Sequence, residues 1–160
     1  MGAGKTAVGR HIARRLKHQF LDSDHELERR TGVDIPTIFE FEGEEGFRSR
    51  ESAVIDELTQ GRGIVLATGG GAVIDPINRR HLAARGTVIY LCTTIDTQLE
   101  RTSRDRNRPL LQTSDPRTRL ESLMAVRDPL YREIADIVVS TDNSRMPLLV
   151  NGIIKRLESL

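Results

Sequence analysis

Tryptophan, long apolar stretches and any strong excess of charge are missing from this chain of 160 residues, and cysteine occurs only once. Its one cysteine, Cys92, cannot form an internal disulfide, which favours a reducing compartment, and we expect a cytoplasmic protein. No run approaches the roughly 18 apolar residues of a membrane span, so no membrane partner is expected. The formal net charge of +1 gives no sign of nucleic-acid binding. We expect one soluble domain over residues 1–160, acting as a monomer.

The chain opens with the second half of a phosphate-binding loop, Gly2-Ala3-Gly4-Lys5-Thr6. In the full pattern, G-x-x-x-x-G-K-[ST], the first glycine would fall two positions before Met1. Backbone N–H groups of such a loop close on phosphate oxygens, and the positive end of the next helix faces the same anion. Lys5 would reach the outer phosphates, and Thr6 would offer its hydroxyl to Mg²⁺. A glycine turn before a helix that has a lysine by chance is the alternative.

Strand and helix patterns alternate along the rest of the chain. Short apolar runs at 64–67, 87–91 and 137–139 are typical of strands buried on both faces, and a further short strand covers 20–21. Helices are expected at 5–17, 26–30, 35–42, 44–60, 78–85, from 95, at 117–126 and at 148–160. The alternation predicts a three-layer α/β domain, in which helices flank a parallel sheet.

Two aspartates, Asp22 and Asp24, follow the first strand, at the end of the sheet where open α/β proteins bind ligands. Because side chains alternate along an extended chain, we expect the two carboxylates to face opposite sides. One would face Mg²⁺ and its waters, and the other an acceptor hydroxyl. Two solvated turn aspartates are the alternative.

Arginines provide candidate partners for anionic groups. Arg48 and Arg132 carry the planar fork that matches a carboxylate, although a solvated helix face is the commoner role of a single arginine. The segment at about 102–116 has little apolar content and follows Arg101; it predicts a lid that closes over phosphates. An ordinary exposed loop is the alternative. The basic residues of this stretch are Arg101, Arg104, Arg106 and Arg108.

Three glycines, Gly69-Gly70-Gly71, directly follow the apolar strand 64–67. Glycines at the end of a strand let a ligand approach the backbone closely, whereas a flexible turn is the alternative. The four histidines, in contrast, have no spacing typical of metal ligands. The chemistry is therefore expected at the strand ends and not at a histidine cluster.

These motifs together resemble those of the shikimate kinase family, in order and in spacing, over essentially the whole chain from residue 2. The segments that carry the resemblance are Gly4-Lys5-Thr6, Leu21-Asp22-Ser23-Asp24, Phe47-Arg48-x-x-Glu51, Thr68-Gly69-Gly70-Gly71-Ala72-Val73, Arg108-Pro109-Leu110-Leu111 and Pro129-Leu130-Tyr131-Arg132. The resemblance implies a P-loop fold of the nucleoside-monophosphate-kinase type. It also implies ATP- and Mg²⁺-dependent phosphorylation of the 3-hydroxyl of shikimate, a step in chorismate and aromatic amino acid biosynthesis.

The resemblance implies a role for each motif residue. ATP phosphates and Mg²⁺ would be held by Gly2, Ala3, Gly4, Lys5 and Thr6, with Asp22 reaching the metal through water. Asp24 would orient or deprotonate the 3-hydroxyl, and Arg48 and Arg132 would clamp the carboxylate. Gly70 and Gly71 would close against the ring hydroxyls, and the helices at about 33–60 would bind the substrate. Arg108 would come down with the lid, and the adenine would be flanked by Arg101 and by Arg145 with Pro147.

Family members have a buried strand and the first loop glycine ahead of the present Met1. We therefore expect the first, central strand of the sheet to be absent from this chain, which would leave open strand edges and an apolar gap. Two other interpretations stay open. One is an inactive truncated fragment with residual ligand binding, and the other is a related small-molecule kinase such as gluconate kinase.

Overall fold

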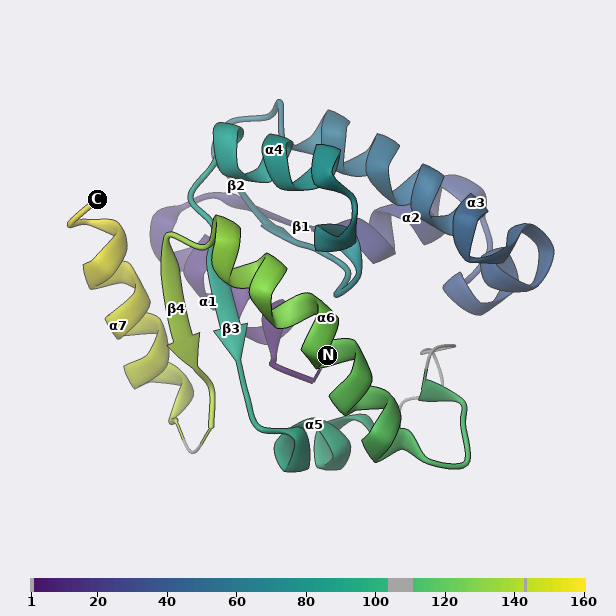
Figure 1. The fold of residues 1–160 in the computed structure, drawn as a ribbon. Coiled ribbons are helices and arrows are strands. Elements are labelled where there is room, and N and C mark those ends of the chain that lie inside the picture. Colours follow the sequence, from purple (N-terminus) through teal and green to yellow (C-terminus); the bar gives the residue numbers. More distant parts are fainter. Residues whose placement is uncertain (1, 104–110, 143) are drawn as a thin grey trace.

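Two pairs of parallel strands, surrounded by helices, make up the fold (Figure 1). The computed structural model describes residues 2–103, 111–142 and 144–160. β1 (Gln19–Asp22) pairs with β2 (Ile64–Ala67), and β3 (Ile89–Cys92) pairs with β4 (Ile137–Ser140). Within the described residues the two pairs form separate sheets. The predicted α/β class with parallel strands is confirmed.

Seven described helices connect and cover the strands. Five of the helices are capped by a side chain that accepts a hydrogen bond from a first-turn N–H; the capping residues are Asp22, Asp34, Asp75, Thr94 and Asp115. None of the described helices is long and apolar enough to cross a membrane. They are α1 (Lys5–Leu16), α2 (Ser23–Thr31), α3 (Ile35–Leu58), α4 (Pro76–Arg85), α5 (Ile95–Thr102), α6 (Pro116–Ile134) and α7 (Met146–Leu157), with a 3₁₀ turn at Ala72–Ile74.

Two elements differ from the sequence-based expectation, and both differences reposition candidate site residues. α2 begins at Ser23, so Asp24 lies in the first turn of a helix and not on an extended strand. The predicted alternation of Asp22 and Asp24 along a strand is therefore wrong. α6 continues to Ile134 with Pro129 inside it, although proline disfavours a helix interior, whereas the predicted helix ends at residue 126.

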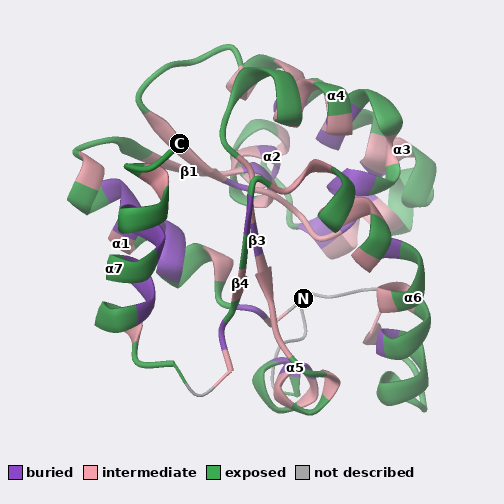
Figure 2. Ribbon diagram, turned by 60° about the vertical axis from the view of Figure 1, so that its left-hand side comes forward, coloured by how far each residue is buried: buried purple, intermediate pink, exposed green. Residues whose placement is uncertain are grey.

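The apolar core lies in two places. α1 and α7 pack their buried faces together against the strands, as the burial colouring shows (Figure 2), through Val8, Ile12, Val150 and Ile153. A second cluster joins α2 to α3 through Leu27, Ile38, Phe47 and Val54. α3 is interrupted at Gly43, whose φ of 70° and ψ of −176° are not helical, as the prediction of two helical segments there implies.

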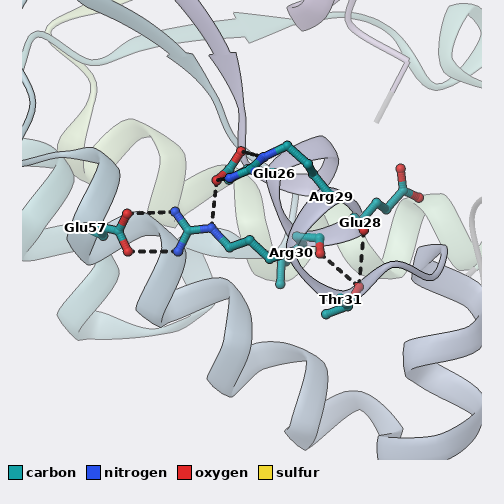
Figure 3. Close-up of polar contacts among 7 residues, drawn as sticks. Glu26, Glu28, Arg29, Arg30, Thr31 and Glu57 are labelled. Atoms are coloured by element: carbon teal, nitrogen blue, oxygen red, sulfur yellow. Dashed lines mark hydrogen bonds and ion pairs between the residues drawn. The ribbon is translucent and has the colours of Figure 1, made fainter.

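Charged groups also tie α2 to α3 (Figure 3). Arg30 bonds Glu57 through both terminal nitrogens, at 2.8 and 2.7 Å, and donates from Nε to Glu26 at 2.7 Å. Arg29 adds a two-point contact to the same Glu26 carboxylate. These arginines lower the pKa of Glu26 to about 2.

A cavity of about 540 Å³ lies between β2 and β3, the inner strands of the two sheets. Its walls are mostly apolar and include Val65, Leu66, Ile89 and Leu91. It reaches the phosphate loop at Ala3 and Lys5, and it reaches the glycine segment at Gly69 and Gly70. An apolar gap, as predicted, thus lies between the two sheets.

Candidate active site

The phosphate loop, residues 2–6, has the backbone form that its glycines predict. Gly2 has a φ of +66° and Gly4 a φ of +81°, a region that side-chain-bearing residues rarely adopt. Gly4 is the N-cap of α1, so the first N–H groups of that helix point out of the loop. This arrangement supplies backbone donors and the positive end of a helix for an anion.

Thr6 and Asp22 are joined at the edge of the phosphate loop. The Thr6 hydroxyl donates to Asp22 Oδ2 at 3.1 Å. The other oxygen of the same carboxylate accepts from the backbone N–H of Asp24 at 3.1 Å. The pair of a hydroxyl and a carboxylate is a donor set that suits Mg²⁺, which prefers oxygen ligands and keeps several waters. In the described residues no cluster of three or more His, Cys, Asp or Glu offers a separate metal site.

Arg101 closes the other flank of the phosphate loop. It donates to the carbonyl of Gly2 at 3.0 Å and to the hydroxyl and carbonyl of Thr141 at 3.2 and 3.3 Å. Arg145, the other residue predicted beside the adenine, is exposed at the N-cap of α7. Arg104, Arg106 and Arg108, which the predicted lid at 102–116 contains, lie outside the described residues.

The glycine segment meets two carboxylates from different helices. A Cβ on Gly69 would lie 2.5 Å from Glu51 Oε1 and 2.8 Å from Asp24 Oδ1, so only glycine fits between them. The N–H of Gly69 donates to the hydroxyl of Ser23 at 3.1 Å. Asp24 and Glu51 thus lie against the backbone of the glycine segment, on the α2–α3 side.

Arg48 is held over the same segment. It donates to Glu51 Oε2 at 2.7 Å and to Glu44 at 3.2 Å. A Cβ on Gly71 would overlap two nitrogens of Arg48, so the guanidinium covers that glycine. Glu51 is fully buried, and this burial raises the pKa of its carboxyl group against the opposing effect of Arg48.

Arg127, from α6, approaches this group from the other side. Only 3% of it is exposed, and its Nε has no hydrogen-bond partner among the described residues. Burial lowers the pKa of Arg127, and the charge of the neighbouring Arg48 acts in the same direction. Arg48 and Arg127 therefore both act on one buried carboxylate, that of Glu51, and both oppose the rise of its pKa that burial causes.

The side chain of Arg132 does not lie with those of Arg48, Glu51 and Arg127. Its Nε donates to Asp128 at 2.7 Å, its guanidinium lies 5.8 Å from the centre of the Tyr90 ring, and its side chain is about half exposed, at 55%. The sequence-based prediction names Arg132, from the resemblance of Pro129-Leu130-Tyr131-Arg132 to the family motif, and does not name Arg127. On a continuous α6, residues 127 and 131 lie on one face, while 132 is turned about 100° from 131.

Comparisons with known proteins agree with this geometry. The family model described as shikimate kinase matches residues 1–158. A shikimate kinase of Thioalkalivibrio sulfidiphilus is 63% identical over 96% of this chain and 80% of its own length. One from Vibrio cholerae is 58% identical over 99% of this chain and 91% of its own.

The chain belongs to the shikimate kinase family.

Solved structures of the family carry the same fold. The shikimate kinase of Acinetobacter baumannii in complex with shikimate has a TM-score of 0.97 at 53% identity, covering 99% of this chain and 89% of that one. The enzyme of Bacteroides thetaiotaomicron has a TM-score of 0.89 at 28% identity, covering 99% and 94%. This chain is thus an ATP-dependent kinase of the P-loop fold, with shikimate as the acceptor.

For a shikimate kinase, the two parts of the site divide naturally. The first part is the phosphate loop, residues 2–6. The second part, which we call the acceptor cradle, consists of Asp24, Arg48, Glu51, residues 69–71, Arg127 and Tyr131. Asp22 connects them, because its carboxylate bonds Thr6 on one side and the N–H of Asp24 on the other.

Proposed function

We propose that the acceptor cradle holds shikimate by its carboxylate between Arg48 and Arg127. The observation that carries this assignment is that the partly exposed Arg48 and the buried Arg127 both act on Glu51, with a partnerless Nε on Arg127 within the described residues. A buried cation favours an anionic partner, and a carboxylate accepts two N–H bonds from an arginine fork. Glu51 would keep Arg48 in position through its 2.7 Å bond.

We assign the acceptor hydroxyl to Asp24. It lies in the first turn of α2 beside Gly69, and its backbone N–H is bonded to Asp22, the residue next to the phosphate loop. Asp24 would accept the hydrogen bond of the 3-hydroxyl and orient its oxygen toward the γ-phosphorus. As the phosphoryl group moves, the hydroxyl proton would pass to this carboxylate or to the phosphoryl oxygens.

The phosphate side would work by positioning and charge. The backbone of residues 2–5 and the N-terminus of α1 would hold the phosphates, with Lys5 on the outer ones. Thr6 and Asp22 would hold Mg²⁺, which neutralises negative charge on the phosphates when bound. Gly2 and Arg101 would border the nucleotide, with Arg145 near the adenine, and Arg108 keeps its predicted role in the lid.

The direct test is ADP release by this chain with MgATP and shikimate. We expect release that depends on shikimate and not on gluconate or a nucleoside monophosphate. Asp24→Asn should lower kcat about 10²- to 10⁴-fold, the usual contribution of a positioned base. Asp96→Asn, which changes an exposed carboxylate on α5, is the matched control and should stay near wild type. Near-normal turnover by Asp24→Asn would contradict the assignment of Asp24 to the acceptor hydroxyl.

Four further sequence-based statements stay predictions: a monomer, a cytoplasmic location, a substrate-binding region at about 33–60 and a lid at about 102–116. Sedimentation would check the first and cell fractionation the second. Phosphoryl transfer to gluconate in place of shikimate would favour the alternative of a related small-molecule kinase. Shikimate binding without any turnover would favour the inactive fragment.

A further inference from the structure

Tyr131 lies between the glycine segment and the helix that carries Arg127. Its hydroxyl donates to the carbonyl of Gly70. Its ring stacks on that of Tyr90 in β3, with centroids 4.7 Å apart and planes 30° apart. Burial raises the pKa of Tyr131, while the charge of the adjacent Arg127 opposes that shift. The hydroxyl is therefore a neutral donor that touches the substrate-facing backbone, and the ring fixes its direction.

The hydrogen bond to the Gly70 carbonyl also orients the N–H group of the next residue, Gly71. A peptide unit is planar and trans, so the direction of the Gly70 C=O fixes the direction of the Gly71 N–H on the opposite side. Glycine has no side chain to restrict rotation of this unit, and its backbone is the most permissive of any residue. The hydrogen bond from Tyr131 therefore selects one orientation of the peptide unit between Gly70 and Gly71.

The neighbouring backbone groups are held by other elements. Ser23 of α2 accepts from Gly69, Asn78 of α4 donates to the Ala72 carbonyl at 3.0 Å, and Arg79 of α4 donates to that of Val73 at 2.6 Å. The Tyr131 bond differs because it comes from α6. Arg127 lies one helical turn before Tyr131 on the same face. The bond thus sets the glycine backbone relative to Arg127.

We propose that Tyr131 is a positioning residue, whose hydroxyl fixes the Gly70–Gly71 peptide relative to the Arg127 guanidinium. It acts through these two groups on the acceptor and has no part in the chemistry of transfer. The inference rests on the proposed function, because the acceptor is taken to lie between Arg127 and the glycine segment.

The test is Tyr131→Phe, which removes the hydroxyl and keeps the ring stack. The KM for shikimate should rise roughly 3- to 10-fold, the effect of one hydrogen bond, while the KM for MgATP changes less than about 2-fold. Tyr90→Phe is the matched control, because it also removes one hydroxyl from the same pair of stacked rings. The Tyr90 hydroxyl donates to Asp128 at 2.7 Å. Tyr90→Phe should leave the shikimate KM within about 2-fold of wild type.

Two further measurements separate positioning from general stability. In an Arg127→Ala background, Tyr131→Phe should have a smaller effect than in wild type, since the two groups act on one ligand. In the ligand-free chain, amide hydrogen exchange over 69–71 should be faster in Tyr131→Phe and unchanged in Tyr90→Phe. An equal rise of both KM values, an additive double variant, or unchanged exchange would overturn the inference. Failure of the proposed function would appear differently, as absence of shikimate-dependent turnover in wild type, and the exchange measurement would still decide the role of Tyr131.

Discussion

The acceptor cradle and the phosphate loop meet at Asp22, yet the chain builds them in different ways. In the cradle, side chains from α2, α4 and α6 hold the backbone of residues 69–73. The phosphate loop takes its form from two glycines with positive φ and from the start of α1, and its Ala3 and Lys5 border the cavity between β2 and β3. The backbone of the cradle is thus held by side-chain hydrogen bonds, and the phosphate loop is shaped by its own backbone conformation.

Lys5→Ala and Arg48→Ala should separate the two parts most strongly. Lys5→Ala should lower kcat about 10²- to 10³-fold, because it removes charge stabilisation where negative charge develops. Shikimate binding should hardly change in this variant. Arg48→Ala should instead weaken shikimate binding, by roughly 30-fold or more, much more than ATP binding. Steady-state kinetics with each substrate varied in turn gives the comparison, with the exposed Arg15→Ala of α1 as control.

Equal loss of affinity for both substrates in Arg48→Ala would argue against a carboxylate clamp. Lys5→Ala that weakens shikimate binding as strongly as Arg48→Ala would show that the two parts are not separate.

Gly69→Ala should measure how tightly the cradle is packed. The added Cβ would lie 2.5 Å from an oxygen of the fully buried Glu51, so we expect a loss of about 1–3 kcal/mol in the free energy of unfolding. Gly86→Ala is the control, because Gly86 has extended backbone and a Cβ added there would have no atom within 4 Å. Urea unfolding of both variants checks this. Equal free energies of unfolding for Gly69→Ala and Gly86→Ala would show that the side chains around Gly69 can move aside at little cost.

The smallest expected effect is a pH dependence at the α2–α3 contact behind the cradle. The pKa of Glu26 lies at about 2 in the folded chain, against an ordinary value of 4.5, because Arg29 and Arg30 bond its carboxylate. Its stabilisation is complete above about pH 4.5 and is lost as the pH falls toward 2. The melting temperature of Glu26→Gln should therefore fall less steeply than that of wild type over this range. Parallel curves for the two proteins would contradict the assignment.

The sequence predicted the strands and most helices well, because apolar runs and glycines mark them directly. The run 64–67 became β2 with the same bounds, and α3 is interrupted at Gly43, between the predicted helical segments 35–42 and 44–60. The phosphate loop was predicted equally well, since a local motif specifies a local backbone. These features depend only on neighbours in the chain.

The cradle could be predicted only in part, because its contacts join distant segments. The phase of α6 across Pro129 decides whether Arg127 or Arg132 faces Arg48, whereas the family motif alone pointed to Arg132 and the predicted helix ended at residue 126. The pairing of Tyr131 with Gly70 spans 61 positions and leaves no local pattern. One signal could have shown which face of α6 each residue occupies. It is the i, i+4 spacing of Arg127 with Tyr131 and of Asp128 with Arg132.

The choice between the two arginines is the central claim about the acceptor, and shikimate binding measured by calorimetry tests it most directly. Wild type, Arg127→Ala and Arg132→Ala would be titrated with shikimate under the same conditions. Because Arg127 would pair as a buried charge with the shikimate carboxylate, binding should be weaker by roughly 30-fold or more in Arg127→Ala, and Arg132→Ala should stay within about 3-fold of wild type. The reverse order, or an equal loss in both variants, would contradict the account.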